Sequence, residues 1–129
     1  MMDDHIRQAL DQGHVIDITT TGRTSGEPRR IEIMFHNFDG RIYISGMPRP
    51  EPRAWLANLR VDPSLTFHLK GAVQADLPAT ARVIDDVAER ERLMPLVAAA
   101  WNRTDIGDMV AWSPLIEVTI PGYGVGAAA

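Results

Sequence analysis

The feature that most constrains this chain is a series of three segments with the composition of β-strands, joined by turns. Residues 15–21 are β-branched almost throughout, and apolar and more polar side chains alternate along residues 29–38. Both patterns are typical of strands on a half-buried sheet surface. Residues 22–28 between them contain two glycines and a proline, which favour a chain reversal. Asp39-Gly40 suits a type I′ turn before a third strand over residues 41–45, so the sequence predicts an antiparallel meander.

The rest of the chain predicts further strands and short helices. We expect strands over residues 65–70, 81–84 and 115–120, a return of the chain through residues 72–75, and helices over residues 3–12, 52–61, 87–101 and 104–111. Pro52 can serve as the first residue of its helix, and Asp86-x-x-Glu89 fits a capping box. The strand over residues 81–84 is expected to begin after Pro78, and Pro95 is expected to kink or restart the helix around it.

These elements predict a mainly β protein of the α+β class. Five or six strands connected by hairpins, with short helices between them, indicate an antiparallel sheet that closes into a small barrel. A chain of 129 residues, 45% of them hydrophobic, has the size and apolar content of one domain. We assign that domain to residues 1–121 and expect residues 122–129, mostly small residues and glycines, to form a flexible tail.

Composition excludes several classes of site and partner. The chain has no cysteine, which excludes disulfides, thiolate-bound zinc, iron–sulfur clusters and cysteine nucleophiles. The formal net charge is −4, although seven arginines and four acidic residues give the segment from Gly22 to Arg60 a positive excess. This balance argues against nucleic-acid binding and fits a compact anionic ligand; the alternative is that the arginines are solvated and bind nothing.

The chain also lacks signals for membrane insertion or export. Its apolar runs are too short to cross a membrane, and its acidic N-terminus differs from the positive start of a signal peptide. We therefore expect a cytoplasmic protein without integral membrane contact.

No side chain is an obvious catalytic group. His5, His14, His36 and His68 lack a metal-ligand spacing, so no metal site is expected. The serines lack the Gly-x-Ser-x-Gly context of a nucleophile elbow, and no pair of carboxylates is placed by sequence in a cleft. The catalytic residues of any enzyme activity are therefore left unassigned.

Two segments contain hydrogen-bond donors and positive charges that suit the binding of an anion. Arg23, Thr24 and Ser25 lie in the glycine-containing turn 22–26, which either cradles a phosphate or is an ordinary turn between two strands. The turn lacks the Gly-Lys-Ser/Thr of a P-loop and leads into a strand, which also excludes a dinucleotide-binding fingerprint. The loop 45–53 combines a hydroxyl group and two guanidinium groups, which suit an anionic cofactor tail or a solvated rim.

The order of these segments is similar to that of a known family. Residues 20–33, 39–46 and 55–63 resemble the deazaflavin-dependent nitroreductase family of the flavin-binding split β-barrel superfamily, and the similarity extends over residues 15–120. The resemblance implies an FMN-binding-like split β-barrel, commonly a homodimer, that binds coenzyme F-420 or, in relatives, FMN. It also implies hydride transfer to an electron-poor acceptor such as a quinone or nitro compound. In such chemistry the cofactor carries the reactivity, which agrees with the lack of a catalytic triad.

The resemblance also implies which residues contact the cofactor. The turn and the following strand would line it through Arg23, Thr24, Ser25, Gly26, Arg30, Glu32, Ile33, Met34 and Phe35. A second group would border its tail: Ser45, Gly46, Met47, Arg49, Arg53, Trp55 and Asn58.

One departure from the family pattern lies after the third strand. Nitroreductases of the family usually carry Ser-Lys-Gly-Gly there, whereas this chain has Ser45-Gly46-Met47-Pro48, so Arg49 or Arg53 would replace the lysine that faces the cofactor phosphate. Two alternative functions remain open: an FMN-dependent reductase, and a non-catalytic barrel that sequesters a flavin, haem or lipid-like molecule. The sequence names neither the acceptor nor the direction of electron flow.

Overall fold

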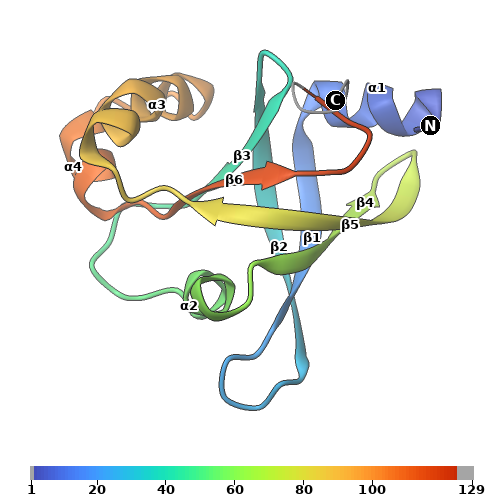
Figure 1. Ribbon diagram of the computed structural model, residues 1–129. Coiled ribbons are helices and arrows are strands. Elements are labelled where there is room, and N and C mark those ends of the chain that lie inside the picture. The colour runs from blue at the N-terminus through green and yellow to red at the C-terminus, as the bar shows by residue number, and fades with distance from the viewer. Residues whose placement is uncertain (1, 125–129) are drawn as a thin grey trace.

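This computed structural model describes residues 2–124 of the 129-residue chain. Within them, six strands form one closed antiparallel barrel, and four helices lie around it (Figure 1). The strands are β1 (His14–Thr21), β2 (Pro28–Phe38), β3 (Arg41–Ser45), β4 (Ser64–Lys70), β5 (Gln74–Val83) and β6 (Leu115–Thr119). The helices are α1 (Asp4–Gln12), α2 (Ala54–Val61), α3 (Val87–Ala100) and α4 (Ile106–Trp112). The strand order is β1-β2-β3-β6-β5-β4, and β4 pairs again with β1. The predicted mainly β barrel with short peripheral helices is therefore confirmed.

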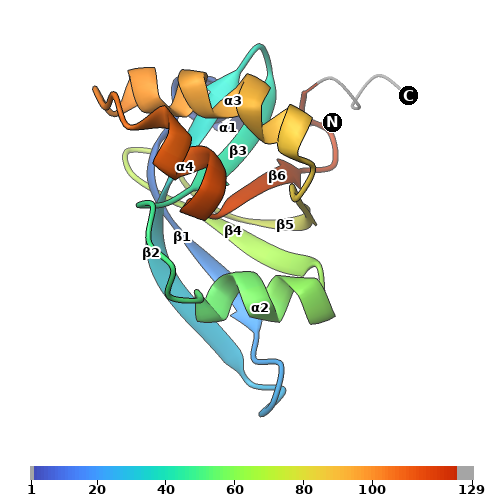
Figure 2. The same ribbon diagram turned by 90° about the vertical axis from the view of Figure 1, so that its left-hand side faces the viewer.

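The first three strands form the meander that the sequence predicts. β1 pairs with β2 from His14↔Phe35 to Thr21↔Pro28, and β2 pairs in turn with β3. Asp39 has φ 54° and Gly40 has φ 83°, so both central residues of this turn have the positive φ of a type I′ turn. The β1–β2 ribbon continues past the barrel, and the turn between its strands projects at the bottom of Figures 1 and 2.

β5 corrects the predicted start of this strand, because it begins at Gln74, before Pro78, rather than at Ala81. It is one continuous strand, in which Pro78 lies opposite Thr66 of β4. β5 pairs with β4 over residues 74–80, whereas its pairing with β6 begins only at Thr80. Pro78 therefore pairs with β4 on one side of β5 and has no β6 residue paired with it on the other side. A proline, which has no N–H to donate, is tolerated at such a position.

The helices correct two expectations about proline. α2 begins at Ala54 rather than at Pro52, because the N-cap Arg53 is extended, with φ −100° and ψ 128°. α3 runs through Pro95 without a break, so the predicted restart does not occur. At the start of α3 the N–H of Glu89 donates to the Asp86 carboxylate at 2.9 Å, which confirms the Asp86 half of the predicted capping box, whereas the Glu89 carboxylate accepts from Arg82 instead. No helix within residues 2–124 is both long and apolar enough to cross a membrane.

The barrel interior contains the main hydrophobic core. The rings of Phe35 and Phe67 pack edge to face there, with centroids 5.1 Å apart, and Leu10 of α1 is completely buried against this core. A second cluster lies beneath α3 and α4, where Met94 and Met109 are completely buried. Figure 2 shows α3 and α4 together at one end of the barrel and α2 at the other. The two ends therefore present different surfaces to a ligand.

Tyr123 lies in the segment that the sequence predicts to be a flexible tail. Its ring is 7% exposed, and its hydroxyl donates to Asp11 Oδ1 at 2.5 Å and accepts from Asn37 Nδ2 at 2.7 Å. Burial raises the pKa of Tyr123 to about 12, so the phenol stays neutral at ordinary pH. The described part of the expected tail is anchored here, and residues 125–129 lie outside the described residues.

Candidate functional site

The end of the β1–β2 ribbon and one face of α2 enclose a cavity of about 510 Å³, which we call the turn pocket. Its lining consists of Thr20, Gly22, Arg23, Thr24, Ser25, Arg29, Arg30, Ile31, Ala54, Trp55 and Asn58. Six of the residues that the sequence comparison placed around a cofactor therefore meet here. They come from two segments of the chain, the turn with the start of β2, and α2, which the fold brings together.

Asn58 is the residue that joins these two segments. It is 3% exposed, and its Oδ1 accepts hydrogen bonds from the backbone N–H of Arg23 at 3.1 Å and from Arg23 Nη1 at 3.2 Å. Its Nδ2 donates to Thr20 Oγ1 at 3.1 Å, and Thr20 is itself 2% exposed. A buried amide that uses both ends in this way fixes the position of α2 relative to the turn and holds the Arg23 side chain in place.

The backbone of the turn is braced by its own hydrogen bonds. The N–H of Gly22 donates to the carbonyl of Glu27 and the N–H of Gly26 donates to the carbonyl of Gly22, both at 2.8 Å. The N–H of Glu27 donates to Ser25 Oγ at 3.1 Å. A Cβ on Gly22 would lie 2.6 Å from that same Oγ, so a larger residue here would displace the Ser25 hydroxyl from its bond to Glu27. With these amides engaged, the donors left for an anion are the N–H groups of Thr24 and Ser25, which have no partner in residues 2–124, and the side chains of the turn.

The three arginines of the turn pocket differ in how their charge is balanced. Arg30 Nε donates to Asp17 at 2.9 Å, and Arg29 lies 3.8 Å from Glu27. Arg23, in contrast, makes no ion pair with a carboxylate in residues 2–124. Its guanidinium is exposed and is oriented by Asn58, and its remaining N–H groups are available to a ligand. Arg23 is therefore the best-placed cation in the pocket for an anionic ligand.

Beyond Ile31 the predicted strand residues, Glu32, Ile33, Met34 and Phe35, do not line the turn pocket. Ile33 and Phe35 pack with the barrel core, whereas Glu32 and Met34 are exposed on the outer face of β2. Glu32 accepts a hydrogen bond from Lys70 Nζ, which also donates to Asp17 at 2.8 Å. The hydrogen bonds from Lys70 and Arg30 hold the pKa of the Asp17 carboxyl below its usual value. This outer face therefore carries a paired charge cluster beside the pocket.

The loop 45–53 also lies away from the turn pocket. Ser45 Oγ is buried and donates to the carbonyl of Pro114 at 2.7 Å, and a Cβ on Gly46 would lie 2.9 Å from the Pro114 ring. The Arg53 guanidinium donates to the backbone carbonyls of Met47, Arg49, Glu51 and Trp112. Arg53 thus stabilises the conformation of this loop, and few of its N–H groups remain free to bind a phosphate.

Arg49 and Arg53 line a different cavity, of about 560 Å³, which we call the second cavity. It lies between the loop 49–53, α2, the start of α3 and α4. The structure therefore brings Arg23, Thr24, Ser25, Arg30, Trp55 and Asn58 together, and it places Arg49 and Arg53 elsewhere. An anion held by Arg23 and an anion held by Arg49 would be in separate cavities.

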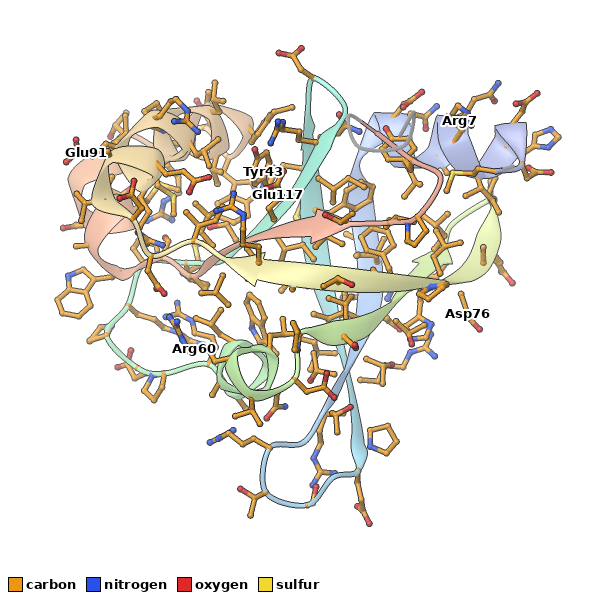
Figure 3. The ribbon with its side chains drawn as sticks, in the orientation of Figure 1. Arg7, Tyr43, Arg60, Asp76, Glu91 and Glu117 are labelled. Carbon is orange, nitrogen blue, oxygen red and sulfur yellow. The ribbon has the colours of Figure 1, made fainter. Side chains whose placement is uncertain are left out.

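A hydrogen-bonded chain of three side chains is a feature that the sequence did not indicate. Thr19 Oγ1 and His68 Nε2 are 2.7 Å apart, and His68 Nδ1 and Asp76 Oδ1 are also 2.7 Å apart. The three residues lie on the neighbouring strands β1, β4 and β5, and Asp76 lies at the outer surface (Figure 3). The alternation along β4 places His68 on the face opposite Phe67, but only the strand register reveals its two partners.

Solved structures agree with this fold. A conserved hypothetical protein from Mycobacterium tuberculosis is 15% identical, with a TM-score of 0.70 over 93% of this chain and 81% of that one. A structure described as an F420-H2 dependent reductase (FDR-A) is 21% identical, with a TM-score of 0.59 over 81% and 93%. One described as a domain-swapped dimer is 21% identical, with a TM-score of 0.61 over 90% and 95%. At these identities the likeness shows the fold alone, and no curated protein matches the chain.

The family is shown by a comparison with protein-family models. The model described as F420H(2)-dependent quinone reductase matches residues 2–112, which include the whole turn pocket and the first five strands. The match spans well over half of the sequence. The chain therefore belongs to the F420H(2)-dependent quinone reductase family.

Proposed function

We propose that the turn pocket binds coenzyme F-420 and that the protein transfers a hydride from the reduced cofactor to an electron-poor acceptor, a quinone or a nitro compound. Family membership supports use of F-420 by a reductase. The observation that carries the assignment of the site is Arg23, a cation without a carboxylate partner in the described residues and fixed by the buried Asn58. A fixed, uncompensated guanidinium is suited to a phosphate.

The residues of the turn pocket fit this cofactor, which has a flat ring system and a phosphate. Arg23 would bind the phosphate, with the hydroxyl of Thr24 as a further donor on the same turn. Trp55 is partly buried in the pocket wall and offers an aromatic surface to a flat ring. The site thus combines a cationic side and an aromatic side within one cavity.

When bound, coenzyme F-420 supplies the hydride chemistry, and the protein's own residues bind, orient and exclude water. Asn58 keeps the Arg23 guanidinium at one position, so the charge is in place before a ligand arrives. On the neighbouring outer face the charges of Arg30 and Lys70 are balanced by the carboxylates of Asp17 and Glu32, which leaves Arg23 as the main attraction for an anion. This division of roles requires no catalytic triad.

A turnover assay tests this function. Purified protein is mixed with reduced F-420 and either a quinone such as menadione or a nitroaromatic compound, and oxidation of the cofactor is followed by its absorbance. We expect acceptor-dependent oxidation that falls strongly in Arg23→Gln and is unchanged in Arg92→Gln, an exposed arginine on α3 outside the pocket. No oxidation with either acceptor, or turnover only with reduced FMN, would contradict the proposal. Binding of a flavin without turnover would support the carrier alternative.

We also propose that the protein is a homodimer. A structural relative is described as a domain-swapped dimer. On the outer face of the barrel Val15 and Met34 lie opposite each other in the β1–β2 register and are 43% and 42% exposed. Adjacent exposed apolar side chains of this kind suit a surface that a second copy of the chain covers. Sedimentation equilibrium would give twice the chain mass if the proposal is right. A monomer at micromolar concentration would contradict it, and Val15→Asp should weaken the dimer.

A further inference from the structure

The second cavity lies on the opposite face of α2 from the turn pocket. Ala54, Trp55 and Asn58 of this helix line the turn pocket, whereas Leu56 and Arg60 line the second cavity. At 100° per residue these two sets point in opposite directions. Figure 2 shows α4 across from α2 on this side, and Figure 3 shows Arg60 beside α2. The two cavities are therefore separate places to bind a ligand.

Much of the wall of the second cavity is apolar. Leu56 of α2, Val83 at the end of β5, Val110 of α4 and Trp112 at the end of α4 contribute aliphatic and aromatic surface. The Trp112 side chain is 52% exposed, although it is the largest apolar side chain of the lining. A cavity of about 560 Å³ with such walls has room for the hydrocarbon body of a small molecule.

The charges in the second cavity are predominantly positive. Four arginines and two carboxylates, Glu51 and Asp85, line it. Three of those arginines are already engaged. Arg53 donates to loop carbonyls, Arg60 makes two 2.8 Å hydrogen bonds to Asp85, and Arg90 donates to the carbonyls of Ile84, Met109, Val110 and Ser113. Arg49 remains, an exposed guanidinium that makes no side-chain hydrogen bond or ion pair within residues 2–124.

Ser113 also belongs to the lining of the second cavity, but its hydroxyl group is closed to a ligand. The residue is 3% exposed, and its Oγ, which has no hydrogen-bond partner in the described part of the chain, is shielded from solvent. A molecule in this cavity therefore meets the Arg49 guanidinium and the apolar walls.

We propose that the second cavity binds an amphipathic organic anion, with its carboxylate or equivalent acidic group held by Arg49 and its apolar body against Leu56, Val110 and Trp112. A neutral apolar molecule would leave the Arg49 charge unused, and a bare inorganic anion would leave the apolar walls in contact with water. A molecule with both parts matches both features. The site is distinct from the turn pocket and does not depend on the function proposed for it.

Two tryptophans make the proposal testable, because Trp55 lines the turn pocket and Trp112 lines the second cavity. Octanoate is titrated into ¹⁵N-labelled protein while the indole N–H signals, assigned with Trp→Phe variants, are followed by NMR. We expect a saturable shift of the Trp112 signal and none of the Trp55 signal. The neutral counterpart 1-octanol, which has the same chain length, should produce a much weaker effect.

Variants separate the proposed site from general adsorption of the amphiphile. Arg49→Gln should weaken octanoate binding by about tenfold or more, the usual consequence of losing a charge-assisted hydrogen bond. Arg23→Gln, in the turn pocket, should leave octanoate binding unchanged. A linear, non-saturating shift, a shift of Trp55 in place of Trp112, or equal binding by wild type and Arg49→Gln would each overturn the proposal.

Discussion

Replacing Asn58 with alanine is expected to lower both the stability of the fold and its affinity for the cofactor. The substitution removes three hydrogen bonds, two from Arg23 and one to Thr20. The Thr20 hydroxyl is 2% exposed and would be left without a partner, which costs about 1–3 kcal/mol. Arg23 is exposed, so water can replace most of what it loses. With the packing lost at Asn58 itself, we expect the free energy of unfolding to fall by about 2–3 kcal/mol.

Urea denaturation followed by circular dichroism measures this change, and a drop in Tm of about 6–12 °C should accompany it in a domain of this size. Gln74→Ala, which removes an exposed amide at the start of β5, is the matched control and should stay within about 0.5 kcal/mol of wild type. The double variant with Thr20→Val should lose less stability than the sum of the single changes, because the two groups bond to each other. An Asn58→Ala variant as stable as wild type would refute the reasoning.

Two further substitutions test buried histidines. His68→Ala should lower the free energy of unfolding by about 1–3 kcal/mol in urea titrations, because it leaves Thr19 and Asp76 without their shared partner; a loss no larger than that of Gln74→Ala would contradict this. Burial holds the pKa of His36 below its ordinary value of 6.5, so below that pH the unfolded chain binds a proton that the folded chain does not. Wild type should therefore lose stability from pH 7 to pH 5, and His36→Phe should lose less; equal slopes in thermal melts would refute this.

The meander could be predicted because its signals are local. The β-branched run before the turn, the alternation after it and the Asp39-Gly40 pair each specify backbone shape within a few residues. The continuous β5 could not be predicted in the same way. Whether Pro78 interrupts a strand depends on where β6 begins to pair, and β6 lies more than thirty residues further along the chain.

The site shows the same division between local and distant signals. Arg23, Thr24 and Ser25 share one turn, so their proximity follows from sequence, and the family resemblance added Trp55 and Asn58. Arg49 also looked suitable for the same anion, but α2 separates it from Arg23. The partners of His68 lie 49 residues before it and eight after it, on strands whose register is set by closure of the barrel.

The central claim is that the turn pocket holds the cofactor through Arg23, and a binding titration tests it most directly. Coenzyme F-420 is titrated at moderate salt into wild type, Arg23→Gln and Arg92→Gln, and its fluorescence is followed; FMN is titrated separately. The account predicts saturable binding of F-420 that Arg23→Gln weakens by about 1.5–3 kcal/mol, while Arg92→Gln binds as wild type does. Equal affinities of Arg23→Gln and wild type, or binding of FMN alone, would contradict it.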